Sequence, residues 1–189
     1  MKMGLKLIFM GTPEFAVPIL KSIHGSKHEI LCVYTQPPKK KNRGQKIDSS
    51  PVQKFAESSS LKLRFPSDFD NEEYQYIKRL NPNVVVVAAF GKILPKKILD
   101  INNVQFLNVH ASLLPKWRGA APIQRAIMNL DKTSGISIMK IVSKLDSGPT
   151  LIKSEIPINN NTNFVSLSNQ MSKLGAVKIL EALNLIENN

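Results

Sequence analysis

The feature that most constrains the fold is an uninterrupted apolar run at residues 84–89, Val-Val-Val-Val-Ala-Ala. β-branched residues favour strands. A strand without alternating polar residues is buried on both faces, which is typical of parallel sheets covered by helices. The run therefore predicts a central strand of an α/β protein.

Strand and helix patterns alternate on both sides of this run. Further strands are expected at residues 5–10, 28–34, 61–65 and 104–110, with a hairpin at 135–142 and 150–156. Helices are expected at residues 13–23, 51–58, 72–80, 94–99, 121–128 and from 164 onward. Thr12 is expected to cap the first helix, and Pro18 to kink or weaken it. The order predicts a doubly wound, Rossmann-like, mostly parallel sheet with helices on both faces and a mixed edge.

Composition narrows the functional class. The 26 Lys+Arg residues outnumber the 14 Asp+Glu residues, for a formal charge of +12, which favours a polyanionic partner. A single cysteine excludes an intramolecular disulfide and fits a reducing compartment. No apolar stretch approaches the ~18 residues of a membrane span, and no cluster has metal-ligand spacing. We expect a cytoplasmic protein of one domain, without membrane or metal.

The strongest candidate chemistry lies at the end of residues 104–110. Asn108 and His110 are two residues apart, so a strand places them on one face. An amide and an imidazole can stabilise an oxyanion, and a carboxylate such as Asp146 can orient the imidazole. The alternative, with similar weight on spacing alone, is that Asn108 caps the loop, His110 is a satisfied core residue and Asp146 only begins a turn.

Ligands of doubly wound sheets bind beyond the carboxyl ends of the strands. Residues 11–15, 90–95 and 108–119 should converge there. Residues 36–54 read as a long basic surface loop that could contact a phosphate backbone. Trp117 could stack on a base, but anchoring of its own loop is the favoured interpretation.

Four segments together resemble the methionyl-tRNA formyltransferases, within the wider 10-formyltetrahydrofolate-dependent formyltransferases. They are residues 9–15 (Phe-Met-Gly-Thr-Pro-Glu-Phe), 89–95 (Ala-Phe-Gly-Lys-Ile-Leu-Pro), 108–124 (beginning Asn-Val-His-Ala-Ser-Leu-Leu-Pro) and 145–148 (Leu-Asp-Ser-Gly). The Trp-Arg-Gly-Ala-Ala-Pro-Ile-Gln continuation and the Gly-Thr-Pro-Glu-Phe start are the more specific to the tRNA branch. The resemblance implies the formyltransferase fold.

The resemblance also implies an activity: transfer of a formyl group from the co-substrate 10-formyltetrahydrofolate to the amine of methionine on initiator tRNA, for translation initiation. Asn108 and His110 would stabilise the oxyanion, while Asp146 would hold His110 and help a water carry off the proton. The implied folate residues are Ser112, Leu113, Leu114, Pro115, Phe90, Ile93 and Leu94. The implied methionyl and tRNA contacts are Phe15, Arg43 and Lys46.

Members of this family usually carry a carboxyl-terminal tRNA-binding domain. Residues 1–189 are expected to be the catalytic domain without it, and to be monomeric. One rival is the same chemistry on glycinamide ribonucleotide or an amino sugar nucleotide. The other is a non-catalytic basic module that binds RNA.

Overall fold

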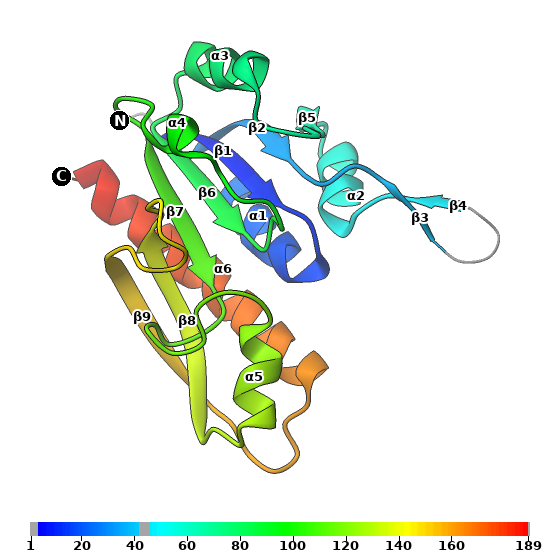
Figure 1. The fold of residues 1–189 in the computed structure, drawn as a ribbon, viewed down its shortest axis with the longest axis vertical. Helices are drawn as coiled ribbons and strands as arrows, with labels where there is room; N and C mark the ends of the chain where they lie inside the picture. Colours follow the sequence, from blue (N-terminus) through cyan, green and yellow to red (C-terminus); the bar gives the residue numbers. More distant parts are fainter. Residues whose placement is uncertain (1–3, 42–45, 189) are drawn as a thin grey trace.

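The computed structural model describes residues 4–41 and 46–188 and is built on a seven-stranded sheet, whose arrangement Figure 1 shows. The strands are β1 (Lys6–Gly11), β2 (Glu29–Tyr34), β5 (Leu63–Arg64), β6 (Val84–Ala88), β7 (Gln105–His110), β8 (Thr133–Lys140) and β9 (Thr150–Pro157). Their order in the sheet is β5-β2-β1-β6-β7-β8-β9. All pairs from β5 to β7 are parallel, whereas β8 pairs antiparallel with both β7 and β9. The predicted mostly parallel sheet with a mixed edge is confirmed.

Helices cover both faces of this sheet, as predicted. The helices are a 3-10 turn, η1 (Glu14–Ala16), and α1 (Val17–His24), α2 (Pro51–Ser58), α3 (Asn71–Leu80), α4 (Lys96–Leu99), α5 (Pro122–Met128) and α6 (Phe164–Asn188). Buried side chains of α1, α2, α5 and α6 belong to one core cluster, and those of α3 and α4 to the other. In Figure 1, α1 and α6 lie behind the sheet and α3 and α4 lie at its upper front.

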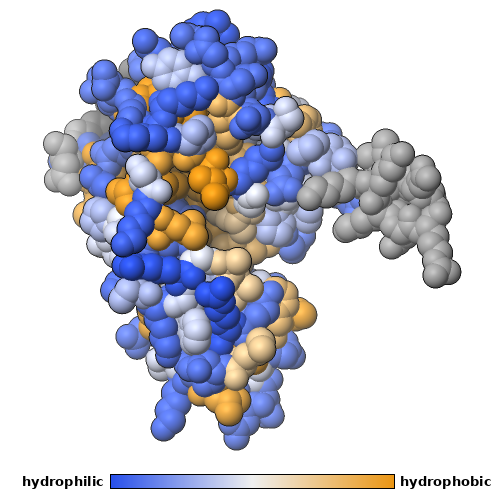
Figure 2. Space-filling model, in the orientation of Figure 1, coloured by the Kyte–Doolittle hydropathy of each residue, from blue (hydrophilic) through white to orange (hydrophobic). Residues whose placement is uncertain are grey.

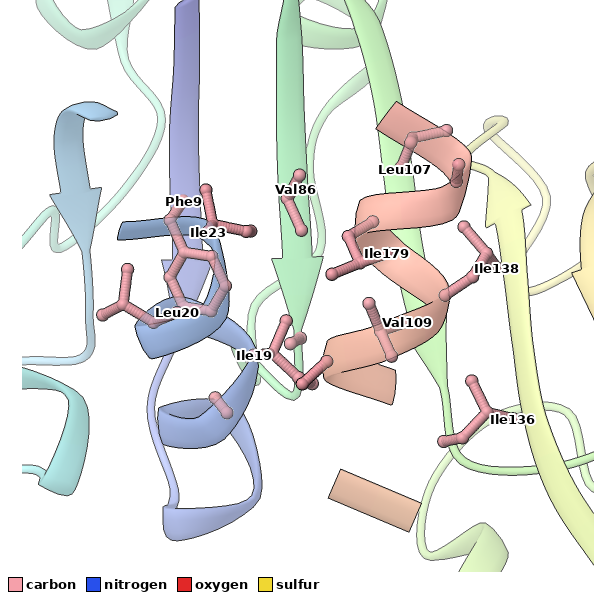
Figure 3. Close-up of a cluster of buried hydrophobic side chains, with 14 of the residues drawn as sticks. Phe9, Ile19, Leu20, Ile23, Val86, Leu107, Val109, Ile136, Ile138 and Ile179 are labelled. Atoms are coloured by element: carbon pink, nitrogen blue, oxygen red, sulfur yellow. The ribbon is translucent and has the colours of Figure 1, made fainter. Parts of the chain in front are cut away.

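The packing of the core determines which face of β7 carries the polar side chains of the candidate site. Leu107 and Val109 are buried against α1 and α6, in the cluster drawn in Figure 3. Full burial of each such side chain contributes about 1.5–3 kcal/mol. Because side chains alternate along a strand, Asn108 and His110 must point to the opposite face. The apolar positions of β7 thus set the direction of its two polar side chains.

The start of the first helix differs from the prediction. Thr12 is not a helix cap: its hydroxyl donates to the Phe90 carbonyl at 3.0 Å and accepts from the Gln36 amide at 3.3 Å. A 3-10 turn follows, and α1 begins only at Val17. Pro18 therefore lies in the first turn of α1, where its missing N–H costs no helical hydrogen bond. The expected kink at Pro18 was wrong for this reason.

The long basic loop contains two short strands, β3 (Lys39–Lys41) and β4 (Lys46–Asp48), paired antiparallel. The prediction of a long surface loop missed this hairpin, because pairing satisfies backbone groups that side-chain periodicity does not report. Arg43 lies outside the described residues. The backbone of Lys46 begins β4.

His28, just before β2, is buried, and its Nδ1 accepts a hydrogen bond from the Leu5 amide at 3.1 Å. Burial lowers the pKa of His28 below its ordinary 6.5, and Lys27 adds to this lowering against an opposing effect of Glu187. The folded protein thus favours the neutral ring, while the unfolded chain binds a proton near pH 6.5. The free energy of unfolding should therefore fall as the pH drops below about 6.5.

The variant His28→Asn keeps an acceptor for the Leu5 amide but cannot titrate. We expect urea unfolding between pH 7 and 5 to show a shallower loss of stability for this variant than for the parent. Identical slopes would contradict the assignment of a depressed pKa to His28.

Candidate active site

The carboxyl end of β7 presents Asn108 and His110 side by side. Asn108 is half-buried, and the His110 side chain is 7% exposed. The register aligns them with Met139 and Ser137 of β8. The first two predicted site residues therefore share one strand face, as the spacing requires.

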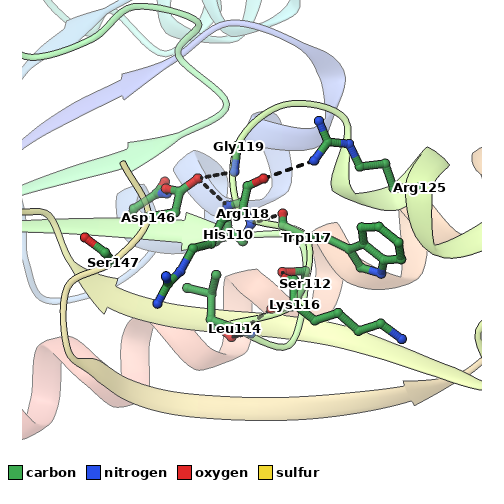
Figure 4. A network of polar contacts seen from close by, with 12 residues as sticks. His110, Ser112, Leu114, Lys116, Trp117, Arg118, Gly119, Arg125, Asp146 and Ser147 are labelled. Atoms are coloured by element: carbon green, nitrogen blue, oxygen red, sulfur yellow. Dashed lines mark hydrogen bonds and ion pairs between the residues drawn. The ribbon is translucent and has the colours of Figure 1, made fainter. Parts of the chain in front are cut away.

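Asp146 meets this pair from the turn between β8 and β9. Its Oδ1 accepts from the Asn108 Nδ2 at 3.3 Å, and its Oδ2 lies 3.6 Å from the His110 Nδ1. The second distance is too long for a hydrogen bond. A stronger contact comes from the Gly119 amide, which donates to Oδ2 at 2.8 Å. Figure 4 shows Asp146 facing both His110 and Gly119. The structure thus brings the three candidate catalytic residues together.

The turn can fold back onto the sheet because of Gly148. A Cβ at this position would lie 1.9 Å from the Lys140 carbonyl oxygen. The Lys140 amide also donates to the Pro149 carbonyl at 2.9 Å, which closes the turn. Asp146 itself has a φ of 42° in the left-handed region, which aspartate tolerates better than most residues. This backbone path delivers the carboxylate to His110.

The other ring nitrogen of His110 is engaged by the following loop. Nε2 lies 3.0 Å from the Trp117 carbonyl oxygen. A carbonyl only accepts, so Nε2 carries the hydrogen. This leaves Nδ1 as the ring atom nearest Asp146. The arrangement fixes the ring's orientation, as catalytic histidines require.

Four predicted folate residues lie in the loop after β7. Ser112 is fully buried and donates to the Lys116 carbonyl at 2.5 Å, so its hydroxyl holds the loop closed. Leu114 is buried, its amide donates to the Ser137 hydroxyl at 3.0 Å, and its peptide bond to Pro115 is cis. Leu113 is partly buried and Pro115 is exposed. The two that remain accessible are therefore Leu113 and Pro115.

The segment after β6, which contains the other three predicted folate residues, exposes one of their side chains and otherwise mainly backbone. The Phe90 and Leu94 side chains are buried in the core cluster of α3 and α4, whereas Ile93 is 82% exposed. The Phe90 carbonyl accepts from Thr12 and from the Gln36 Nε2 at 3.0 Å. These bonds tie the ends of β1, β2 and β6 together.

The predicted acceptor residues are less defined. Phe15 lies in η1, partly buried against the α1 and α6 core, and its carbonyl accepts from Ser172 at 2.7 Å. Arg43 falls outside the described residues, and only the backbone of Lys46 is described. Among the described residues, no hydrogen bond links Phe15 to Asn108, His110 or Asp146.

Two contributors to the site were missed from the sequence. The Gly119 amide, which holds Asp146, has no side-chain signal at all. Asp131 accepts from the Trp117 Nε1 at 2.7 Å, which confirms Trp117 as a loop anchor. Burial alone would raise the pKa of Asp131, but hydrogen bonds from Lys116, Asn129 and Trp117 bring this pKa below its usual value. A local signal for this distant pairing was lacking.

Within the described residues, no group of three or more histidine, cysteine, aspartate or glutamate side chains is placed to hold a metal ion. None of the helices in the described part of the chain combines the length and apolar character needed to cross a bilayer.

Solved structures share this fold. A glycinamide ribonucleotide transformylase 1 from Symbiobacterium toebii superposes with a TM-score of 0.81, covering 100% of this chain and 90% of its own, at 15% identity. A sugar N-formyltransferase from a Shewanella species gives a TM-score of 0.70, covering 97% of this chain and 70% of its own, at 16% identity. At such identities the likeness establishes the fold alone.

Sequence relatives are closer. A methionyl-tRNA formyltransferase of Pelagibacter ubique is 52% identical over 181 residues, covering 95% of this chain and 58% of the relative. One from Fusobacterium nucleatum is 44% identical over 184 residues, covering 97% and 59%. The chain therefore spans less than two thirds of the length of these relatives. Because residues 5–183 match the formyl transferase family model, the chain belongs to the formyl transferase family.

Proposed function

We propose that this chain transfers a formyl group from 10-formyltetrahydrofolate to the amino group of methionine on initiator methionyl-tRNA. The observation that supports this best is the convergence of Asn108, His110 and Asp146 at one sheet edge. The relatives named methionyl-tRNA formyltransferase point to the acceptor.

The chemistry needs an oxyanion site and a path for one proton. The amine nitrogen attacks the formyl carbon, forming a C–N bond while the carbonyl oxygen gains negative charge. The bond from that carbon to the folate nitrogen then breaks, and a proton passes from the amine to the folate nitrogen. Removing one donor from such an oxyanion site typically costs about 10²–10³-fold in rate.

The three side chains suit these tasks. An Asn108 Nδ2 has two hydrogens, and its bond to Asp146 at 3.3 Å is long and occupies only one of them. The His110 Nδ1 side stands beside Asp146 without a hydrogen bond to it. We propose that Asn108 and a doubly protonated His110 stabilise the oxyanion, with His110 donating from Nδ1. Asp146 would orient this ring, stabilise its positive charge and guide a water that removes the amine proton.

The folate is proposed to lie between two loops, one after β6 and one after β7. Ile93 in the loop after β6 is 82% exposed, and Leu145 in the turn between β8 and β9 adds a second apolar side chain, 61% exposed. Figure 2 shows apolar surface gathered in the middle of the face that carries the loop after β6, with hydrophilic surface around it. An apolar strip beside polar groups suits a flat heterocycle.

The tRNA is proposed to contact the basic segment that contains β3 and β4. The formal charge of +12 favours a polyanion, and backbone phosphates are bound without sequence preference. In this proposal Arg43 and Lys46 contact the acceptor stem and Phe15 contacts the methionyl side. We further propose that the chain is a cytoplasmic monomer and that residues 1–189 form the catalytic domain.

The rival acceptors are glycinamide ribonucleotide and an amino sugar nucleotide, and the solved neighbours include a glycinamide ribonucleotide transformylase and a sugar N-formyltransferase. The test is a competition in which the 189-residue chain receives 10-formyltetrahydrofolate with methionyl-tRNA and glycinamide ribonucleotide together. We expect formylmethionine, measured after hydrolysis of the aminoacyl ester, to be the main product. Preferential formylation of glycinamide ribonucleotide would select the rival enzyme, and RNA binding without any formyl transfer would select the non-catalytic module.

A further inference from the structure

Asp131 is a buried carboxylate that anchors the loop after β7. It is not one of the three candidate catalytic residues, Asn108, His110 and Asp146. Its side chain is 4% exposed. Oδ2 accepts from the Trp117 Nε1, and Oδ1 accepts from the Lys116 Nζ and the Asn129 Nδ2, each at 2.7 Å. Two of these donors are consecutive residues of the active-site loop. A buried carboxylate with three donors is a well-satisfied, fixed point.

Trp117 connects this fixed point to His110. Its φ of 59° lies in the left-handed region, which bulky residues rarely adopt unless their surroundings hold them there. In this conformation its indole reaches Asp131 while its carbonyl oxygen lies 3.0 Å from the His110 Nε2. Figure 4 shows the indole directed away from His110 and the Trp117 carbonyl directed toward it. Trp117 therefore forms one hydrogen bond with Asp131 through its indole N–H and another with His110 through its backbone carbonyl.

We propose that Asp131 is a positioning residue for His110. It acts by holding Trp117 so that the Trp117 carbonyl oxygen accepts a hydrogen bond from the His110 Nε2. With Nε2 committed in this way, Nδ1 is the ring nitrogen presented to Asp146 and to substrate. Partners that hold the other nitrogen of a functional histidine set its tautomer and orientation. The effect on rate rests on the proposed formyl transfer, whereas the effect on the His110 ring does not.

A purely structural anchor makes a different prediction from a positioning residue. Loss of an anchor lowers stability and leaves the histidine ring of the folded fraction unchanged. Loss of a positioning residue changes the ring itself and lowers kcat with little change in KM, because substrates still bind while the reacting groups are misaligned. Small misplacements of this kind cost up to about 10²-fold in rate.

The test combines nitrogen NMR of the imidazoles with kinetics. The chain has 3 histidines, so few ring signals need assignment, and the signal missing in His110→Asn identifies that residue. We expect Asp131→Ala and Trp117→Phe each to shift the His110 ring signals but not those of His24. Each should lower kcat by roughly tenfold to hundredfold with KM for both substrates changed by less than about twofold. Trp117→Phe keeps an aromatic side chain, although a smaller one, and lacks the N–H that Asp131 accepts, so it serves where Asp131→Ala fails to fold.

The double variant tests the route. If Asp131 acts through Trp117, Asp131→Ala in the Trp117→Phe background should cost little further activity. Losses that multiply, or an unchanged His110 signal in a folded Asp131→Ala protein, would overturn the proposal. Asp100→Asn is the matched control, because Asp100 is an exposed aspartate paired with Lys96 outside this network. Shifted His110 signals in variants of a parent that formylates no acceptor would support the positioning and contradict formyl transfer.

Discussion

Replacing His110 with alanine should lower kcat for formyl transfer by roughly 10²–10³-fold, the range for loss of one oxyanion donor. The ring lies between the Trp117 carbonyl and the Asp146 carboxylate, so its removal takes away the proposed donor to the oxyanion together with the neighbour of Asp146. The fold should remain, because Leu107 and Val109 keep β7 in the core. Rates at saturating substrate, with circular dichroism and a melting curve, measure both effects.

His24→Ala is the control for loss of a histidine, since His24 is exposed at the end of α1, on a different element from the site. It should leave the rate near that of the parent. Near-normal turnover by a folded His110→Ala protein would eliminate His110 from the mechanism. Unfolding of His110→Ala would be resolved with His110→Asn, which keeps a polar group near the Trp117 carbonyl.

Replacing Asn108 with alanine should lower kcat by roughly 10²–10³-fold, the cost of removing one oxyanion donor. The KM values should change little, because this donor acts mainly on charge that develops in the transition state. Asn108→Asp is the sharper variant. It keeps the size of the side chain but turns a donor into an acceptor that faces the Asp146 carboxylate, so it should be at least as inactive as the alanine variant.

Asn102→Ala, on an exposed turn before β7, is the matched control and should retain parental rates. An Asn108→Asp protein with nearly full activity would show that no hydrogen is donated from this position. If KM instead rises while kcat is unchanged, so that kcat/KM falls by the same factor, Asn108 contributes to substrate binding and not specifically to the transition state.

Much of the fold could be predicted because the core pattern is local. The uniform apolar run at 84–88 and the two-residue alternation along β7 report burial directly. The start of α1 could not be predicted in this way, because the Thr12 hydroxyl bonds Phe90, 78 residues away. The β3–β4 pairing and the burial of His28 likewise depend on neighbours that the local pattern does not name.

The site divides in the same manner. That Asn108 and His110 share a face follows from the strand period, and the Gly-containing turn at Asp146 indicates a carboxylate partner for them. Whether the carboxylate reaches them depends on the antiparallel β8 and on the close approach of Gly148 to Lys140. Ser112 gives the opposite result. The resemblance implies a folate contact for it, but its buried hydroxyl donates to the Lys116 carbonyl of its own loop.

The amino-acid sequence by itself determined the sheet, the polar face of β7 and the family resemblance, because these follow from side-chain period and from continuous motifs. Only the tertiary structure decided how the histidine ring is held. The Trp117 carbonyl lies 7 residues from His110 in the chain, Asp131 lies 14 from Trp117, and Gly119 lies 27 from Asp146, and they meet because the loops fold back on one another. Hydrogen bonds of this kind depend on where the backbone passes in space, which residue types alone do not specify.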